Sequence, residues 1–343
     1  MTQATTVGLD VAKHVFQAHG IDATGRIVIR KRIRRAEVLP FFSKMPRCLI
    51  GMEACGTAHH WARELAALGH EVRLMPPSYV KPYVKRSKND AADAEAICEA
   101  VQRPTMRFVP IKTIEQQSVL MLHRARDLLI RQRTMLANAL RSHFAELGIV
   151  VAQGTANLLK LTAMVEDESD TRIPPVARLT LRAIARQIDT LRTQVRALEE
   201  RIVAWARSNA ASRRLISIPG VGPITATAIA VTIADPSCFH SGRQFAAWLG
   251  LVPRQNSSGG KDRLGGICKR GDRYIRRLLV VGAHAVIRYA RTKGAVAAPW
   301  INNLLDRRST LVVAVALANK TARIAWAVLT RGECYHPKAS ASV

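Results

Sequence analysis

The chain has 343 residues, 48% of them hydrophobic, so it is long enough for two or three domains and can bury a sizeable core. Lys and Arg total 52 against 25 Asp and Glu, and the net charge of +27 favours a polyanionic partner, above all nucleic acid. The basic residues spread along the whole chain rather than along one amphipathic helix, which argues against a membrane surface as that partner.

Residues 5–75 predict an α/β domain built on a mixed sheet. Apolar, β-branched segments predict strands at 5–13, 14–22, 25–33, 47–54 and 70–77. A turn at 22–25 joins the second strand to the third, and a helix at 57–68 separates the last two strands. A hairpin followed by strand, helix and strand is typical of a mixed sheet with helices packed against it.

Acidic residues stand where these elements end or begin. Asp10 and Glu53 lie at the ends of apolar strands. Asp90 and Asp93 lie on one face of a helix predicted at 90–102. Carboxylates that converge in this way repel one another unless a cation lies among them, and Mg²⁺ prefers such oxygen ligands. Two ions roughly 4 Å apart would stabilise both the attacking and the leaving oxygen of a phosphodiester.

A structural role for these acids is the alternative. Asp10 can cap a turn, and Asp90 can cap its helix, with Glu95 in the first turns. Asp10 is the harder of the two to explain in this way, because a charge inside an apolar strand is costly without a partner.

A basic stretch at 81–88 precedes the predicted helix. It contains an aromatic residue and four cations, of which Lys85, Arg86 and Lys88 stand at its end. Such a stretch is either a nucleic-acid contact or a solvated basic loop, and we count these last three cations as candidate nucleic-acid contacts.

Long helices are predicted in the middle of the chain. Residues 115–147 are helical, whereas the pattern weakens over 155–175, where acidic residues precede two prolines, and we place a loop near 151–178. A heptad seam follows over 181–205, formed by Leu181, Ile184, Ile188, Leu191, Val195, Leu198, Ile202 and Trp205. The seam is expected to pair with 115–147 as an antiparallel coiled-coil arm or with another subunit, and the sequence leaves both open.

A compact, mainly helical domain is predicted from residue 214 onward. A turn containing Gly220 and Gly222 precedes a helix that opens at Pro223. Backbone N–H groups at a helix start bind phosphate, and the turn is similar to a helix–hairpin–helix DNA-binding element. An ordinary connection between two helices is the alternative.

Two adjacent serines, Ser257 and Ser258, lie in a glycine-rich loop at 254–266. The loop and the residues after it carry cations: Arg254, Lys261, Arg263, Lys269 and Arg270. A serine hydroxyl attacks a phosphodiester only when a base or a metal activates it, and neighbouring cations stabilise the charge on phosphorus. A solvated loop that only binds the phosphate backbone is the alternative.

Two features bear on the cellular compartment. The six cysteines are scattered without a CxxC pair, and the chain starts without a secretory signal, so we expect reduced thiols and a cytosolic location. The most apolar late stretch, 309–330, is interrupted by Asn319, Lys320 and Arg323, which predicts a buried helix rather than a membrane span.

Taken in order, the segments GLDVAK, GMEACGT, KNDAADA, IPGVGPITA and FAAWLGLVPRQNSSGGKDRLGG resemble the DEDD transposases of bacterial insertion sequences, relatives of the invertases that flip pilin genes. The likeness covers nearly the whole chain, and the combination is specific although each motif alone is not. It implies an N-terminal RuvC-like domain with an RNase H-type fold, whose acidic set falls on Asp10, Glu53, Asp90 and Asp93. It also implies an essential serine just after the GL-x-P segment, which falls on Ser258, with Ser257 as the other candidate.

The resemblance further implies a reaction and its partners. The acids and Mg²⁺, as two ions, would activate the serine, which would form a phosphoserine link to DNA before strand exchange. The partners would be donor and target DNA, an element-encoded non-coding guide RNA that pairs with both, and further copies of the chain. In that dimer or tetramer the acids and the serine would meet across subunits. The protein would be cytoplasmic in a bacterium and associated with the nucleoid, without a membrane partner.

These expectations divide the chain into a RuvC-like catalytic domain at 1–110, a helical arm at 111–210, a C-terminal transposase domain at 211–335 and a tail at 336–343. One rival is a Holliday-junction-resolving nuclease, which would activate water with the same acids and would not need Ser258. A non-catalytic nucleic-acid-binding protein with structural acids is a second rival. A catalytically decayed copy is also compatible with the sequence.

Overall fold

The computed structural model describes residues 3–85, 89–261, 263–293 and 299–336. The chain divides into two compact units. The first comprises Met1–Ile114 with Ala234–Cys238, and the second comprises Glu115–Ile233 with Phe239–Val343. Arg86 and Lys88, predicted as nucleic-acid contacts, and most of the predicted tail lie outside the described residues.

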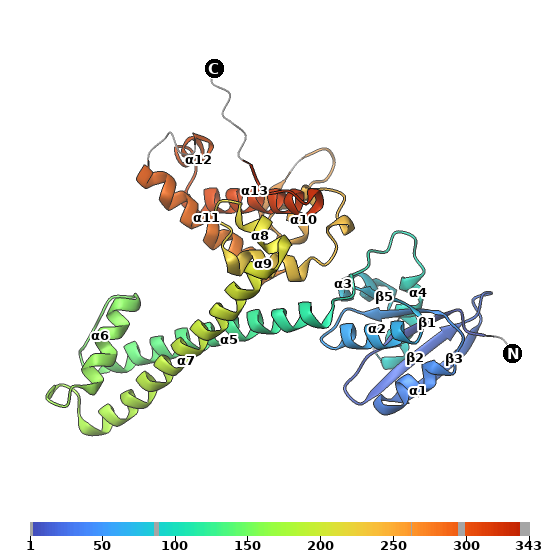
Figure 1. Ribbon diagram of the computed structural model, residues 1–343, viewed down its shortest axis with the longest axis horizontal. Helices are drawn as coiled ribbons and strands as arrows, with labels where there is room; N and C mark the ends of the chain where they lie inside the picture. Colours follow the sequence, from blue (N-terminus) through green and yellow to red (C-terminus); the bar gives the residue numbers. More distant parts are fainter. Residues whose placement is uncertain (1–2, 86–88, 262, 294–298, 337–343) are drawn as a thin grey trace, which may run out of the picture. The chain divides into compact units, whose positions relative to one another are not determined.

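A five-stranded mixed sheet forms the centre of the first unit, with strand order β3-β2-β1-β4-β5 (Figure 1). The strands are β1 (Thr6–Asp10), β2 (Val15–Ile21), β3 (Ile27–Arg34), β4 (Leu49–Glu53) and β5 (Glu71–Met75). β2 pairs antiparallel with β1 and β3, whereas β4 pairs in parallel with β1 and β5. The predicted mixed sheet is confirmed, and its topology is consistent with the RNase H-like domain that the resemblance implies.

Helices cover both faces of this sheet because the side chains of β1 alternate. Leu9 is buried in a cluster that includes Phe16 and Trp61, and Trp61 belongs to α2 (Ala58–Ala67). Gly8 points to the other face, against α4 (Asp90–Val101). The remaining elements of the unit are α1 (Val38–Ser43), α3 (Pro77–Val80) and the 3₁₀ turns η1 (Arg35–Glu37), η2 (Lys81–Tyr83) and η3 (Pro236–Cys238).

Two long helices run antiparallel in the second unit, α5 (Ile114–Glu146) and α7 (Pro175–Ser208) (Figure 1). Near one end, the Trp205 indole N–H donates to the Glu115 carboxylate at 2.8 Å. Toward the other end, Leu140 and Phe144 of α5 share an apolar cluster with Leu181 of α7. Leu181 and Ile188 of the heptad seam thus pack in one apolar cluster with α5 of the same chain.

A helix, α6 (Thr155–Glu166), occupies part of the segment that the sequence predicts as a loop. The loop prediction is wrong for these 12 residues, because Leu161 and Val165 are fully buried against the α5–α7 pair. The loop itself is shorter and follows α6. It is held by the buried Arg178, whose guanidinium donates to main-chain carbonyls that include those of Val165, at 3.1 Å, and Ile173, at 3.5 Å.

The remaining helices build one apolar core at the other end of the second unit. They are α8 (Ala210–Ile216), α9 (Pro223–Thr232), α10 (Gly242–Trp248), α11 (Arg273–Lys293), α12 (Pro299–Leu305) and α13 (Thr310–Arg331). A two-stranded hairpin, β6 (Pro253–Gln255) and β7 (Leu264–Ile267), separates α10 from α11.

α13 is the apolar stretch predicted at 309–330. Among the described helices it alone is long and apolar enough to cross a membrane. Val313, Ala318 and Ala325 lie in the core together with residues of α10 and α11. The prediction of a core helix is therefore confirmed.

Candidate functional site

Two of the predicted acids lie side by side at one edge of the sheet. Asp10 ends β1 and Glu53 ends β4. The two strands are parallel neighbours, and their register pairs Leu9 with Met52. The next step along both strands brings Asp10 beside Glu53, and both side chains are half-buried.

The direction of α4 brings its first residue, Asp90, toward the same edge. Cys98 lies near the start of β1, with its Sγ 3.8 Å from the Thr6 carbonyl oxygen, and Ala94 lies over Gly8. From Gly8 to Asp10 the strand advances by roughly 7 Å. From Ala94 back to the helix start, α4 rises by roughly 6 Å in the same direction. Asp90 therefore lies at about the height of the carboxyl ends of β1 and β4, whereas Asp93, the residue before Ala94, lies nearer the height of Gly8.

Asn89, and not Asp90, caps this helix. The Asn89 side chain accepts a hydrogen bond from the Ala92 N–H at 2.8 Å. Asp90 is the first helical residue, so the capping role considered for it is wrong. Its carboxylate and that of Asp93 lie in the first turn, where the helix dipole favours negative charge.

We call the four residues Asp10, Glu53, Asp90 and Asp93 the acidic edge. The positions of β1, β4 and α4 define this set more than contacts between the four side chains do. Across the described ranges, no three Asp, Glu, His or Cys side chains lie close enough to hold a metal ion. Asp90 is exposed, and the other three acids are half-buried. The donor chemistry, carboxylate oxygens alone, nevertheless fits a hard divalent cation.

Glu95 lies one turn further along α4 and has its own partners. Its carboxylate pairs with Lys85 at 2.6 Å and with Arg30 at 3.5 Å. The hydrogen bond from Lys85 is the main reason that the pKa of Glu95 lies below its usual value. Lys85, predicted as a nucleic-acid contact, is thus an exposed cation that is already engaged with Glu95.

Two residues beside this ion pair were not predicted. Arg30 and His19 stand opposite each other in the β2–β3 register. Burial is the main cause that lowers the pKa of His19; the charge of Glu95 opposes this shift, and the charges of Arg30 and Lys85 add to it. The hairpin pairing of 14–22 with 25–33 was the one signal in the sequence that pointed to their proximity.

The two serines lie in the hairpin formed by β6, the loop that follows it and β7, which we call the serine hairpin. A tight turn closes the loop: Ser258 and Lys261 form a bridge, and Lys261 N–H donates to the Ser258 carbonyl at 3.1 Å. Gly259 and Gly260 between them have φ of 56° and 76°. These left-handed conformations at both central residues are those of a type I′ hairpin turn, which favours glycine.

The two hydroxyls have different surroundings. Ser257 Oγ accepts a hydrogen bond from the Arg263 N–H at 3.1 Å, which ties the two sides of the loop together. No hydrogen bond to the Ser258 hydroxyl is found within the described residues, and its side chain is exposed at the apex. Ser258 therefore presents the hydroxyl that is available to a substrate.

Exposed cations lie along the serine hairpin and just after it: Arg254, Lys261, Arg263, Lys269 and Arg270. None of the five is ion-paired with any acid in the part of the chain that the structure describes. Lys269 has a φ of 56°, and its N–H donates to the Gly250 carbonyl at 3.1 Å, which fixes the base of the hairpin against α10.

The turn at 219–222 joins α8 to α9, as predicted, and its two glycines differ in role. Gly220 has a φ of 84°, and a Cβ there would lie 2.9 Å from the Gly282 carbonyl oxygen of α11. Its need for glycine is thus explained by packing. Gly222 is exposed and caps the start of α9, so its surroundings remain open to a phosphate.

Comparison with known proteins decides the family. Residues 7–149 match the DEDD transposase family of IS110 elements, and residues 212–297 match the family described as "Transposase IS116/IS110/IS902 family". The chain is 50% identical over 332 residues to a Pseudomonas aeruginosa protein named "Probable family 20 transposase", covering 96% of this chain and 98% of that one. The chain belongs to the IS110/IS116 family of insertion-sequence transposases.

Two further relatives align along the whole transposase. The transposase for insertion sequence element IS1328 of Yersinia enterocolitica is 39% identical over 335 residues, covering 98% of this chain and 99% of that protein. The transposase for IS1111A of Coxiella burnetii is also 39% identical, covering 98% of this chain and 92% of its own. The first family match spans the acidic edge and the second spans the serine hairpin. The protein is therefore an enzyme that cuts and joins DNA.

Proposed function

We propose that this transposase cleaves DNA with Ser258 as nucleophile and the acidic edge as a divalent-metal site, and that a guide RNA selects the DNA. One observation carries the proposal. The Ser258 hydroxyl stands exposed at the apex of a tight hairpin, without a hydrogen bond in the described residues, while Ser257 is used to hold that hairpin. A tight turn that presents one hydroxyl suits a nucleophile. A loop that serves only as a solvated linker does not need such a turn.

The serine step conserves the energy of the phosphodiester. Ser258 Oγ forms a bond to phosphorus, and the bond from phosphorus to the leaving sugar oxygen breaks. The hydroxyl proton passes to a carboxylate base, and the leaving oxygen takes up a proton. A sugar hydroxyl of the new partner strand then attacks phosphorus and releases Ser258. Arg254, Lys261 and Arg263 stand close in the hairpin and offset the negative charge that builds on the phosphoryl oxygens.

Asp10, Glu53, Asp90 and Asp93 would hold the metal, which we propose is Mg²⁺ and present as two ions. Support comes from their shared edge and from their chemistry, because carboxylate oxygens are the ligands that Mg²⁺ prefers. The bound metal supplies positive charge that neutralises the carboxylates and the substrate phosphate. The chain's own part is to present two carboxylates from the ends of β1 and β4 and two from the first turn of α4.

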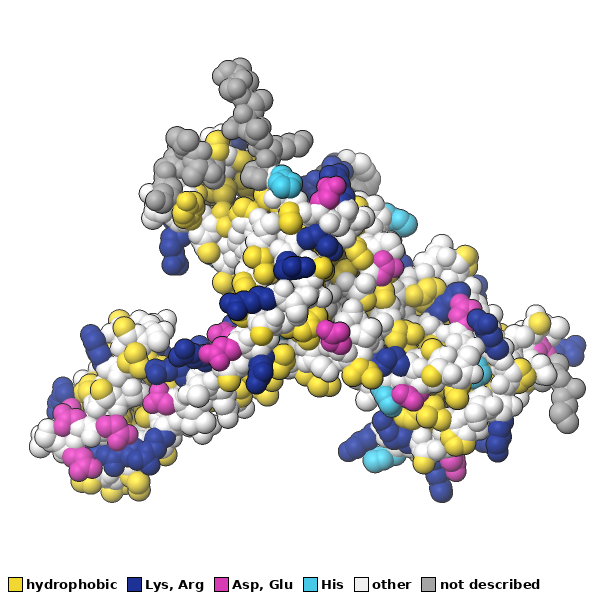
Figure 2. Space-filling model, in the orientation of Figure 1, with side chains coloured by type: hydrophobic (Ala, Val, Ile, Leu, Met, Phe, Trp, Pro, Cys, Tyr) yellow, Lys and Arg dark blue, Asp and Glu magenta, His cyan; other side chains and the backbone are white. Residues whose placement is uncertain are grey.

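The acidic edge and Ser258 belong to different compact units of the chain. For both to act on the same phosphodiester, we propose that the transposase works as a dimer or tetramer in which the acids of one copy serve the serine of another. We also propose that an element-encoded RNA pairs with donor and target DNA, which would leave the protein to read the backbone. Lys and Arg side chains spread over both units on the face shown in Figure 2, as expected for a protein that holds several polyanions.

A covalent-capture experiment tests the proposal. Labelled donor DNA is incubated with the protein, its element's RNA and Mg²⁺, and a denaturing gel compares wild type with Ser258→Ala and Ser257→Ala. We expect a protease-sensitive DNA–protein band that only Ser258→Ala abolishes. Cleaved DNA without a covalent band, unaffected by either change, would instead indicate a nuclease that activates water. Loss with Ser257→Ala alone would move the nucleophile by one residue.

A further inference from the structure

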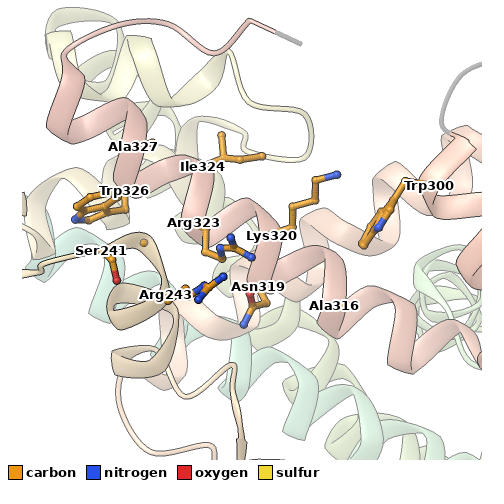
Figure 3. A pocket seen from close by; sticks show the side chains of 11 residues that line it. Ser241, Arg243, Trp300, Ala316, Asn319, Lys320, Arg323, Ile324, Trp326 and Ala327 are labelled. Atoms are coloured by element: carbon orange, nitrogen blue, oxygen red, sulfur yellow. The ribbon is translucent and has the colours of Figure 1, made fainter. Parts of the chain in front are cut away.

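A pocket of about 840 Å³ lies in the second unit, between the start of α10, α12 and α13 (Figure 3). Its size falls within the range of about 300–1,000 Å³ that is usual for small-ligand sites. Arg243 comes from α10, Trp300 from α12, and Lys320, Arg323 and Trp326 from α13. None of these residues belongs to the acidic edge or to the serine hairpin.

The polar side chains of the pocket are mostly cationic. Arg243, Lys320 and Arg323 are exposed, and none of the described lining residues is acidic. These three cations have no ion pair within the described ranges. An unbalanced charge of this kind in a concave site focuses the electric field and attracts a polyanion.

Aromatic and aliphatic side chains form the rest of the wall. Trp300 is 42% exposed, which leaves much of a large apolar ring in contact with solvent. The Lys320 ammonium lies 4.3 Å from the centre of this ring. Figure 3 shows Lys320 extending toward Trp300 and Arg243 and Arg323 close together on the opposite side. An exposed indole beside cations offers a stacking surface for a base next to contacts for its phosphate.

The pocket also continues toward the serine hairpin. Ala316 and Asn319 line both this pocket and a second hollow that reaches Pro253 and Ile267 at the root of the hairpin. The Asn319 side-chain amide donates to the Leu251 carbonyl at 3.1 Å and so joins α13 to that root. The two hollows are thus neighbours along α13.

We propose that this pocket binds an unpaired stretch of the DNA strand, with a base stacked on Trp300 and the backbone phosphates on Arg243 and Arg323. Duplex DNA fits poorly because its bases are already stacked and their faces are hidden. The occupant is therefore the single strand that becomes exposed when DNA is opened for strand exchange. The inference uses the transposase activity but does not depend on Ser258 as the nucleophile.

The test measures binding of labelled oligonucleotides to the full-length protein by fluorescence anisotropy. The probes are a single-stranded DNA, its duplex and a single-stranded RNA of the same sequence. Trp300→Ala should weaken single-stranded DNA binding by about 5- to 150-fold, as expected for the loss of one stacked base, and should leave duplex binding unchanged. Trp300→Phe should restore most of the affinity, and Arg323→Gln should reduce the salt dependence of single-strand binding by about 0.7 in log–log slope.

Matched controls lie on α11, where Tyr289 and Arg288 are exposed but do not line the pocket. Tyr289→Ala and Arg288→Gln should leave all three affinities unchanged. A 2-aminopurine base in the single-stranded probe gives a direct readout, because stacking on Trp300 should quench it in wild type and not in Trp300→Ala. Unchanged single-strand affinity and quenching in Trp300→Ala would overturn the proposal. So would a loss confined to the RNA probe, which would make the pocket an RNA site.

Discussion

Gly8 of β1 and Ala94 of α4 are in backbone contact: a Cβ on Gly8 would lie 2.2 Å from the Ala94 carbonyl oxygen and 2.4 Å from the Cys98 nitrogen. No side chain fits in that space. The contact fixes how far α4 lies from the sheet and how far along β1 it starts. The position of α4 along the sheet, and with it the position of Asp90, therefore depends on a glycine that takes no part in chemistry.

Gly8→Ala should damage both folding and activity. The added methyl meets main-chain atoms, which cannot rotate away, so α4 must shift and the unit should lose about 1–3 kcal/mol of stability. DNA cleavage should fall to background although all four acids are still present. Thermal unfolding and a cleavage assay measure the two effects. Gly56→Ala is the stability control, because nothing lies within 4 Å of a Cβ at that position. An active Gly8→Ala protein would show that the height of α4 does not matter.

Neutral isosteres test the acidic edge. Asp10→Asn and Asp90→Asn keep the shape of the side chain and remove the charge that a divalent cation needs, so we expect strand cleavage to disappear while DNA binding is retained. Glu71→Gln is the matched control, because Glu71 starts β5 at the opposite edge of the same sheet. Cleavage at the wild-type rate by either isostere, with Mg²⁺ present, contradicts a metal role for that residue.

Much of the first unit was predictable because its signals are local. Apolar residues at every second position and the turn at 22–25 predict the strands. Asp10 and Glu53 are singled out because each is a charged residue at the end of an apolar strand. The convergence of Asp90 with them was an expectation that rested on fold type. It becomes a geometric statement only through the contact between Gly8 and Ala94, which joins residues more than eighty positions apart.

The errors came from features that only tertiary contacts decide. α6 was missed because its acidic end and the two prolines that follow dominate the local pattern, while burial of Leu161 and Val165 by α5 and α7 sets the helix. The alternative role of Asp90 as a helix cap overlooked Asn89, which is an equally good cap one position earlier. Ser257 and Ser258 are indistinguishable in sequence and separate only through the hydrogen bond to the Arg263 N–H.

Stability should depend on pH through His123, a buried residue of α5. Its ring nitrogens lie 3.0 Å from Tyr274 Oη and 2.9 Å from Thr227 Oγ1. Burial, with a smaller contribution from the charge of Arg126, lowers the pKa of His123 to about 4. Above pH 6.5 the ring is neutral in both states. As the pH falls from about 6.5 to about 4, His123 becomes protonated in the unfolded chain but stays neutral in the folded chain. The folded state therefore loses about 3 kcal/mol of stability over this range.

His123→Gln removes this titration while an amide can still reach both hydroxyls. The free energy of unfolding, from urea titrations at pH 7.5, 6 and 5, should fall less steeply toward acid in this variant than in wild type. His143→Gln, at an exposed position of the same helix, should follow the wild-type curve. Parallel curves for His123→Gln and wild type would show that the His123 proton does not contribute.

The cations of the serine hairpin predict a specific salt dependence. Each phosphate neutralised by the protein contributes about 0.9 to the slope of log affinity against log salt for duplex DNA. Arg263 is exposed and has no ion pair within the described residues, so Arg263→Gln should lower that slope by about 0.9 and weaken binding most at low salt. Arg172→Gln is the control, because Arg172 pairs with Asp170 at 2.7 Å and its charge is already compensated. Anisotropy titrations from 50 to 300 mM salt, roughly the range in which such slopes are measured, give both values. An unchanged slope for Arg263→Gln would mean that this guanidinium lies beside the DNA path and not on it.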